Sequence, residues 1–326
     1  MVARCVAVLC YDRPMRSLQL GLIAVLLALA TGACSNDESS TPGGSGGSGG
    51  SGASSSGGAT SSGGATSTTS LGGAGAGGSG QGGSPGSSGC GKSSPVGTQA
   101  LSIDVGGSPR TFVLSVPASY QPLTPIDLVF AWHGRGGNGA LAQAYFGIEQ
   151  QAAGAAIFVY PDGLPVDGGE TGWDLTVAGP DVAFFDALRA QIEADYCIDV
   201  GREFSTGHSY GGYMTNTVGC ARANVLRAIA PVAGGGPWGG CDPTPLAAFV
   251  VHGSNDPVVA PSEGQASLEY WRTHASCSDT SQPIEPTGCV EYQGCTSARV
   301  VFCSHDEGHN WPALAPAGVW GFFAAL

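Results

Sequence analysis

Apolar positions follow two spacings that alternate along the chain from residue 110 to its C-terminal end. Short runs rich in Val, Ile, Phe and Ala are typical of strands, whereas longer segments repeat their apolar residues every three or four positions, as a helix does. Expected strands are residues 110–116, 127–132, 156–160, 203–206, 228–233, 247–251 and 299–302. Expected helices are residues 140–155, 181–194, 209–223 and 262–274, with another near the C-terminus. This order predicts an α/β domain with a mostly parallel sheet covered on both faces.

The segment from residue 35 to residue 89 shows neither spacing. All but seven of its 55 residues are Gly, Ser, Thr or Ala. Such a composition cannot bury a hydrophobic core, so we expect a flexible, disordered linker. Residues 90–326 remain, which is a suitable length for one folded domain.

Residues 1–34 are expected to be an export signal. After Met15, which we take as the true start, Arg16 precedes an apolar run over residues 18–30 that is too short to span a bilayer comfortably. The following residues up to Cys34 resemble the lipobox of bacterial lipoproteins, although Thr31 stands where leucine is usual. The resemblance implies that Cys34 is lipidated and is the only link to a membrane. The alternative is an ordinary cleavage site that leads to secretion.

Charge and cysteine content narrow the function classes. Residues 90–326 hold nine Lys and Arg against 22 Asp and Glu, an acidic balance that disfavours nucleic acid as a partner. The same residues hold eight cysteines, and an even number in an exported chain favours disulfides, with 105 pairings open. No cysteines or histidines have the spacing of a zinc site, so we expect no metal.

The motif GxSxG at residues 207–211 gives the first chemical hypothesis. The string also occurs at Ser45, Ser48 and Ser84 because the linker is rich in Gly and Ser, so the string alone is weak. Only Ser209 follows an expected strand and begins an expected helix, which is the setting of a nucleophile elbow. We therefore predict that Ser209 is a nucleophile, with the helix N-terminus available to an oxyanion.

A serine nucleophile requires a histidine base and a carboxylate that orients it. Asp256 follows the strand expected at 247–251, and His309 lies a few residues after the strand expected at 299–302. The order Ser, Asp, His is that of an α/β-hydrolase triad. His305 is kept as the alternative base, and Asp256 could instead only start a turn.

The oxyanion would be held by two backbone N–H groups, those of Arg135 and Tyr210. Arg135 lies in the run WHGRGG after an expected strand, and Tyr210 follows Ser209. His133 is expected to order the loop that contains Arg135. His252 and His274 are expected to be structural.

Five motifs, at residues 132–138, 160–163, 207–212, 252–257 and 308–312, resemble the extracellular esterases grouped as polyhydroxybutyrate depolymerases and feruloyl esterases. The cysteine-led segments at 90–92 and 220–228 are most similar to the feruloyl esterases. The resemblance implies the α/β-hydrolase fold, a triad of Ser209, Asp256 and His309, no cofactor, and a disulfide between Cys277 and Cys295. Cys289 and Cys303 are additional to the family pattern, and their mutual pairing is a hypothesis.

About thirteen residues separate the strands expected at 228–233 and 247–251, which is too few for a large lid and favours bulky substrates. Trp132, Trp173 and Trp311 are expected to bind the substrate, with packing of the loops as the alternative. The working hypothesis is a monomeric exported esterase that releases hydroxycinnamic acids from plant polysaccharide. Polyester oligomers such as hydroxybutyrate, acetylated xylan, and a non-enzymatic binding module are the alternatives.

Overall fold

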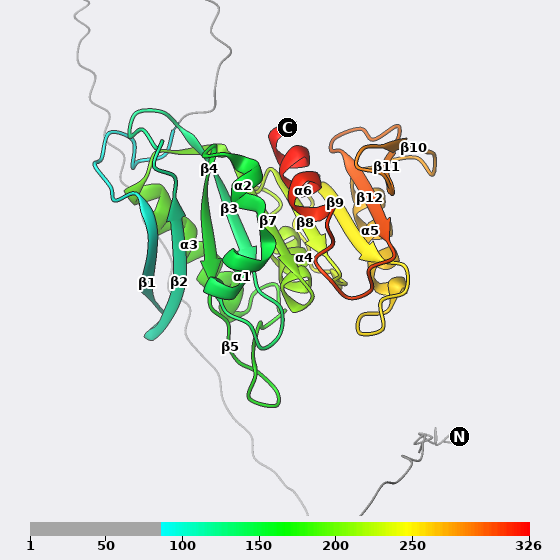
Figure 1. Ribbon diagram of the computed structural model, residues 1–326, viewed down its shortest axis with the longest axis horizontal. Helices are drawn as coiled ribbons and strands as arrows, with labels where there is room; N and C mark the ends of the chain where they lie inside the picture. The colour runs from blue at the N-terminus through cyan, green and yellow to red at the C-terminus, as the bar shows by residue number, and fades with distance from the viewer. Residues whose placement is uncertain (1–85) are drawn as a thin grey trace, which may run out of the picture. The chain divides into compact units, whose positions relative to one another are not determined.

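A sheet of ten strands organises the computed structural model, which describes residues 86–326 (Figure 1). Its strand order is β1-β2-β4-β3-β7-β8-β9-β12-β11-β10. The six central strands β4, β3, β7, β8, β9 and β12 are parallel, and the strands at both edges are antiparallel. The strands are β1 (Gly97–Val105), β2 (Ser108–Val116), β3 (Ile126–Trp132), β4 (Ala156–Pro161), β7 (Ile198–His208), β8 (Ala228–Val232), β9 (Ala247–Gly253), β10 (Ser281–Ile284), β11 (Cys289–Tyr292) and β12 (Val300–His305).

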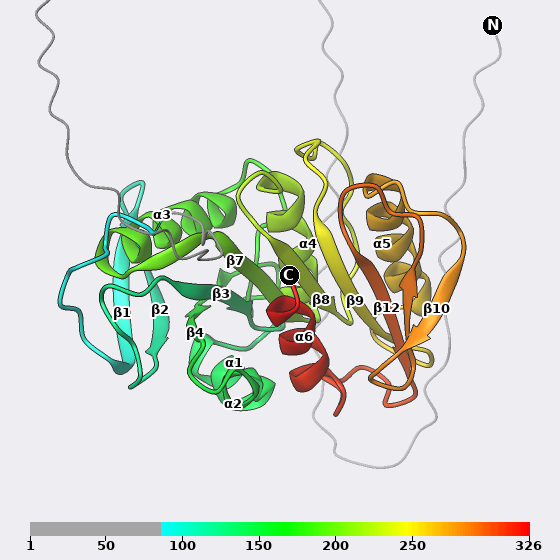
Figure 2. The same ribbon diagram turned by 90° about the horizontal axis from the view of Figure 1, so that it is seen from above.

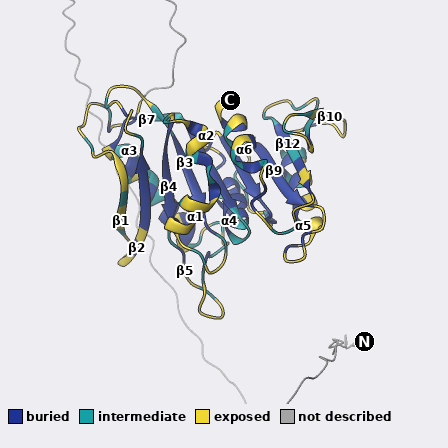
Figure 3. Cartoon of the chain, in the orientation of Figure 1, coloured by how far each residue is buried: buried dark blue, intermediate teal, exposed yellow. Residues whose placement is uncertain are grey.

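Helices cover both faces of this sheet (Figure 2). One face carries α1 (Gly139–Phe146), α2 (Ile148–Ala152) and α6 (Ala315–Ala324), and the other carries α3 (Pro180–Asp195), α4 (Tyr210–Ala221) and α5 (Pro261–His274). The central strands are buried, whereas the outer face of α1 is exposed (Figure 3). This three-layer arrangement confirms the fold class expected from the sequence.

The helix expected over residues 140–155 is divided into α1 and α2. Gly147 lies between them with φ 61°, a left-handed conformation that ends the first helix. Four further strands escaped the sequence pattern: the edge strands β1, β10 and the two-residue pair β5 (Leu164–Pro165) and β6 (Thr171–Gly172). Strands β5, β6 and β10 have only two to four residues each, so hydrophobic patterning does not mark them. Strand β1 does alternate, with Leu101, Ile103 and Val105 packed against the core, and the prediction omitted it. The short β11 was also missed.

The folded unit begins earlier than residue 90. Gly86 forms a β-bridge with Asp199, and the buried Ser87 donates its hydroxyl to the Tyr196 carbonyl at 2.6 Å. The expectation that residues 86–89 belong to a disordered linker is therefore wrong, because their polar groups are bonded to the domain. The expected signal, Met15, Cys34 and linker residues 35–85 lie outside the described residues. No helix of residues 86–326 is long and apolar enough to cross a membrane.

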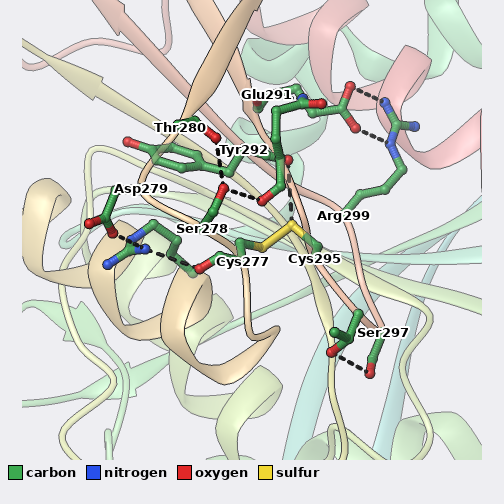
Figure 4. Close-up of a disulfide and its surroundings, with 12 residues drawn as sticks. Cys277, Ser278, Asp279, Thr280, Glu291, Tyr292, Cys295, Ser297 and Arg299 are labelled. Atoms are coloured by element: carbon green, nitrogen blue, oxygen red, sulfur yellow. Dashed lines mark hydrogen bonds and ion pairs between the residues drawn. A yellow bond between two sulfur atoms is a disulfide. The ribbon is translucent and has the colours of Figure 1, made fainter.

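Four disulfides join the eight cysteines of residues 86–326. Cys277 pairs with Cys295, as the family resemblance implied, and Cys289 pairs with Cys303. The other two bonds are Cys90–Cys197 and Cys220–Cys241. Figure 4 shows Cys277–Cys295 beside the ion pair of Arg299 with Glu291, so covalent and ionic contacts together fix the segment around β11.

Candidate active site

Ser209, His309 and Asp256 form one hydrogen-bonded series. Ser209 Oγ lies 2.8 Å from His309 Nε2, and His309 Nδ1 lies 2.7 Å from Asp256 Oδ2. With a neutral imidazole, the serine hydroxyl donates to Nε2 and the Nδ1–H donates to the carboxylate. The alternative base, His305, instead accepts a hydrogen bond from the Glu307 amide at 3.3 Å. The structure therefore brings together the three residues that the sequence singled out, with His309 facing the serine.

The Asp256 carboxylate is completely buried, and both of its oxygens accept hydrogen bonds. Its Oδ1 accepts hydrogen bonds from the amides of Val258 at 2.8 Å and Val259 at 2.9 Å, while Oδ2 accepts from His309. Burial alone would raise the pKa of Asp256, but the hydrogen bonds from His309 and the two amides hold that pKa below its usual value. Asp256 is therefore ionised at neutral pH and fixes the orientation of the imidazole.

The backbone at Ser209 is strained into a sharp turn between β7 and α4. Ser209 has φ 57° and ψ −120°, a conformation that non-glycine residues rarely adopt. The flanking glycines are required by close backbone approaches. A Cβ on Gly207 would overlap the Gly211 carbonyl of α4 and would lie 2.8 Å from the Trp132 carbonyl oxygen of β3, and a Cβ on Gly211 would overlap that same Trp132 oxygen. The spacing of GxSxG thus has a steric cause, which is the turn that presents the serine above the sheet.

The loop after β3 lies directly against the serine. A Cβ on Gly134 would lie 3.4 Å from the Ser209 Cβ. Among residues 86–326, the N–H groups of Arg135 and Tyr210 have no hydrogen-bond acceptor, in contrast to the amides of Gly136 and Gly137. These two N–H groups, which the sequence suggests as oxyanion donors, therefore remain unpaired within the described part of the chain.

His133 orders this loop. Its Nδ1–H donates to the Gly134 carbonyl at 2.7 Å, and its Nε2 accepts from the Gly163 amide at 2.9 Å, so both nitrogens of a neutral ring are used. Burial lowers the pKa of His133, which favours this neutral form. The Trp173 indole N–H adds a bond to the His133 carbonyl at 2.8 Å.

The three tryptophans pack the structure instead of lining the site. Trp132 and Trp173 are 0% and 1% exposed and meet edge to face at 5.0 Å, so the expectation that they bind the substrate is wrong. Trp311 is 7% exposed and stacks on Phe146 at 4.2 Å. Their apolar rings fill the space under the loops, which corresponds to the packing alternative.

A cavity of about 350 Å³ beside the loop after β3 is the feature that the sequence did not reveal. Its apolar wall comes from α1, where the side chains of Leu141 and Tyr145 are 58% and 50% exposed. The Tyr145 hydroxyl accepts a hydrogen bond from the Trp311 amide at 2.9 Å, which ties α1 to the loop that carries His309. The sequence signal was two apolar residues four positions apart on the outer face of an amphipathic helix.

His208 also lines this cavity and lies close to the triad. Its ring lies 5.0 Å from the His309 ring, measured between centroids. Burial, and then the neighbouring His309, lower the pKa of His208 to about 3. The cavity is therefore lined by a neutral ring at physiological pH. Its charged lining residue, Arg135, is paired with Glu170 at 2.9 Å, so the cavity favours an uncharged, largely apolar group.

A larger cavity, of about 540 Å³, lies at the opposite edge of the sheet, among residues that include Arg227, Glu291 and Arg299. Figure 4 shows the last two beside the Cys277–Cys295 disulfide. Arg227 and Arg299 precede β8 and β12, so this cavity faces the N-terminal ends of the parallel strands. The triad lies at their C-terminal ends, where ligands of open α/β sheets bind.

Comparison with known proteins agrees with this geometry. The chain is 38% identical over 255 residues to feruloyl esterase C of Emericella nidulans, covering 72% of this chain and 90% of that protein. It is 32% identical over 266 residues to feruloyl esterase D of Neurospora crassa, covering 72% of this chain and 89% of the relative. No protein-family model matches the chain.

Solved structures show the same fold at low sequence identity. An acetyl xylan esterase from Aspergillus awamori superposes with a TM-score of 0.59 at 17% identity, covering 69% of this chain and 99% of that one. A carboxylesterase from Mesorhizobium loti gives 0.51 at 16% identity, covering 70% of this chain and 99% of that one. The chain thus belongs to the feruloyl esterase family of carboxylic ester hydrolases and has the α/β-hydrolase fold.

Proposed function

We propose that this protein is an exported serine esterase that hydrolyses feruloyl and related hydroxycinnamoyl esters of plant polysaccharide. The observation that carries the proposal is the hydrogen-bonded series Ser209–His309–Asp256 beside an apolar cavity and two unpaired backbone N–H groups. The names of the curated relatives, feruloyl esterases C and D, support this acyl group.

In the first half of the reaction, Ser209 Oγ attacks the ester carbonyl while His309 Nε2 takes the hydroxyl proton. The N–H groups of Arg135 and Tyr210 stabilise the oxyanion, and Asp256 stabilises the imidazolium. His309 then gives its proton to the departing sugar oxygen, which leaves an acyl-enzyme on Ser209. In the second half, water attacks the acyl-enzyme by the same route and releases the acid. The sequence contains every group that these steps require, with no cofactor.

The acyl group would occupy the cavity beside α1. Its volume of about 350 Å³ lies within the range of small-molecule sites, and its wall is largely apolar. An aromatic acid attached by a short unsaturated chain fits these properties better than a single acetyl group, which would leave most of the cavity unfilled.

The decisive experiment compares hydrolysis of methyl ferulate, 4-nitrophenyl acetate and hydroxybutyrate oligomers by the purified protein. We expect the largest kcat/KM for methyl ferulate, and Leu141→Arg should reduce that value more than the value for 4-nitrophenyl acetate. If the folded protein instead prefers 4-nitrophenyl acetate or hydroxybutyrate oligomers, its substrate is acetylated xylan or a polyester. Ser209→Ala, with an unchanged melting temperature, should abolish turnover of all three.

We also propose that the protein is a monomer exported through its N-terminal signal and anchored by a lipid on Cys34. The four disulfides support export, because such bonds persist in oxidising compartments. Incorporation of labelled palmitate into wild-type protein, and its loss in Cys34→Ala, tests the anchor. If cells grown with labelled palmitate release the enzyme into the medium without the label, the protein is secreted and has no lipid anchor.

A further inference from the structure

Exposed apolar side chains gather at the catalytic edge of the sheet. Residues 86–326 contain seven large exposed hydrophobic side chains, and five of them follow the C-terminal ends of parallel strands. These five are Leu141, Tyr145, Leu164, Trp238 and Val258. A concentration of exposed apolar surface beside a reactive group is typical of a binding site. Trp238 is the largest of them and has no part in the acyl cavity.

The Trp238 indole is 65% exposed and stacks on Tyr213, with ring centroids 5.6 Å apart and planes inclined by 15°. Tyr213 is four residues after Ser209, and its amide donates to the Ser209 carbonyl at 3.1 Å. One turn of α4, roughly 5 Å along its axis, therefore separates the nucleophile from the residue that supports the indole. The stacked pair is within reach of a substrate whose ester bond is at Ser209.

The loop that carries Trp238 is fixed at both ends. Near its beginning, the buried Asn216 side chain donates to the Gly235 carbonyl at 2.9 Å. Near its end, the Cys220–Cys241 disulfide joins the loop to the last turn of α4. The exposed position of the indole is therefore held by the structure, and a fixed aromatic surface binds a ligand at a lower entropic cost than a mobile one.

The stacked pair and the acyl cavity lie on different sides of the nucleophile. The cavity is bounded by α1 on one face of the sheet, whereas Tyr213 belongs to α4 on the other face (Figure 2). An ester with its acyl group in the cavity would extend its alcohol half toward α4. A carboxylate is present there, since a Cβ on Gly235 would lie 2.5 Å from Glu263 Oε2 and 2.7 Å from Tyr213 Cε1.

We propose that Trp238, supported by Tyr213, is the binding subsite for the sugar ring that carries the ester. A sugar presents an apolar C–H face, which packs on an aromatic ring, and hydroxyl groups at its edge, which donate to a carboxylate such as Glu263. The inference rests on the proposed function, because it assigns the alcohol half of the same ester.

The test compares kcat/KM for a feruloylated arabino-oligosaccharide with kcat/KM for methyl ferulate, whose alcohol is too small to reach the indole. We expect Trp238→Ala to lower the ratio of these two values about tenfold, mainly through KM, and Trp238→Phe to recover part of the loss. Leu123→Ala is the matched control, because Leu123 is 81% exposed but lies in the loop that precedes β3, and it should leave the ratio unchanged. A ratio for Trp238→Ala within twofold of the wild type would overturn the proposal.

A second measurement separates this inference from the proposed function. If the wild type hydrolyses no ester, the proposed function fails, and the subsite is tested by binding alone. Calorimetric titration of ester-free arabinoxylan oligosaccharide into Ser209→Ala protein should then give a Kd about tenfold lower than titration into the Ser209→Ala, Trp238→Ala double variant. Equal Kd values, or no heat of binding to either protein, would refute the subsite.

Discussion

Replacement of Asp256 by asparagine tests whether the carboxylate sets the tautomer of the His309 imidazole, as the proposed mechanism requires. In the wild type, Oδ1 accepts two backbone N–H groups, from Val258 and Val259, and Oδ2 accepts the Nδ1–H of His309. An asparagine that keeps the two backbone bonds must place its NH₂ against His309 Nδ1. That nitrogen then has to accept, so the proton moves to Nε2, and the imidazole cannot take the proton of Ser209.

The opposite amide orientation is worse, because it would direct the NH₂ at two backbone donors. We therefore expect Asp256→Asn to lower kcat about 10⁴-fold, the effect of the same change in other serine hydrolases. At ~1.36 kcal/mol per tenfold, this loss corresponds to about 5 kcal/mol of transition-state stabilisation.

The assay is steady-state hydrolysis of methyl ferulate at pH 7, with circular dichroism and thermal unfolding to confirm the fold. Asp306→Asn is the control, because Asp306 is an exposed carboxylate in the segment just before His309 and should retain wild-type kcat. A loss of less than tenfold in a folded Asp256→Asn protein would show that the carboxylate does not set the histidine tautomer.

Three further outcomes follow from the packing and the charges. The pKa of Asp256 is depressed in the folded state, so its ionisation stabilises the fold above the unfolded-state pKa of ~3.9. The difference in unfolding free energy between wild type and Asp256→Asn should thus be constant from pH 7 to 5 and shrink as pH falls below 4; urea titrations that show a constant difference down to pH 2 would contradict this assignment. Gly211→Ala should lower the unfolding free energy by at least roughly 1–3 kcal/mol, because the new methyl overlaps the Trp132 carbonyl. The control Gly321→Ala has open space around the new methyl, so the same urea assay should show little change. Replacing Cys277 and Cys295 together by serine should lower unfolding free energy by about 2–4 kcal/mol but retain kcat at 25 °C, because the bond is at the edge opposite the triad; a large loss of kcat in folded protein would be inconsistent with that separation.

The sequence predicted the triad because each member follows a strand at the same edge of the sheet. Local patterns mark these positions: two glycines flank Ser209, and Asp256 and His309 follow apolar strand runs. Parallel strands then bring their C-terminal ends together, so topology supplies the long-range contact that spacing alone does not show.

Local sequence patterns could not predict the role of the tryptophans. Trp132 and Trp173 occur near strand ends, as binding residues often do, but their burial depends on how the loops pack over them. Trp238 shows the reverse case, because no motif surrounds it and its exposure results from the anchoring of its loop by Asn216 and Cys241. Side-chain exposure is decided by tertiary packing, which a local pattern does not encode.

The predicted start of the domain at residue 90 and the predicted single helix at 140–155 were wrong for related reasons. Ser87 lies in a stretch whose composition indicates a coil, yet its hydroxyl and amide bond to the strand and helix around Tyr196 and Ile198. Gly147 interrupts an otherwise continuous apolar spacing by adopting a left-handed conformation. Composition describes an average, whereas a single hydrogen-bonded residue decides where the fold begins.

The central claim is that Ser209 is the nucleophile activated by His309. Its most direct test is treatment of the active protein with a fluorophosphonate, followed by mass spectrometry of the labelled peptides. We predict one phosphonate per chain, attached to Ser209, with loss of esterase activity in proportion to labelling and greatly slowed labelling in His309→Ala. An active protein that stays unlabelled at Ser209, or that is inactivated by a label on another residue, would contradict the claim.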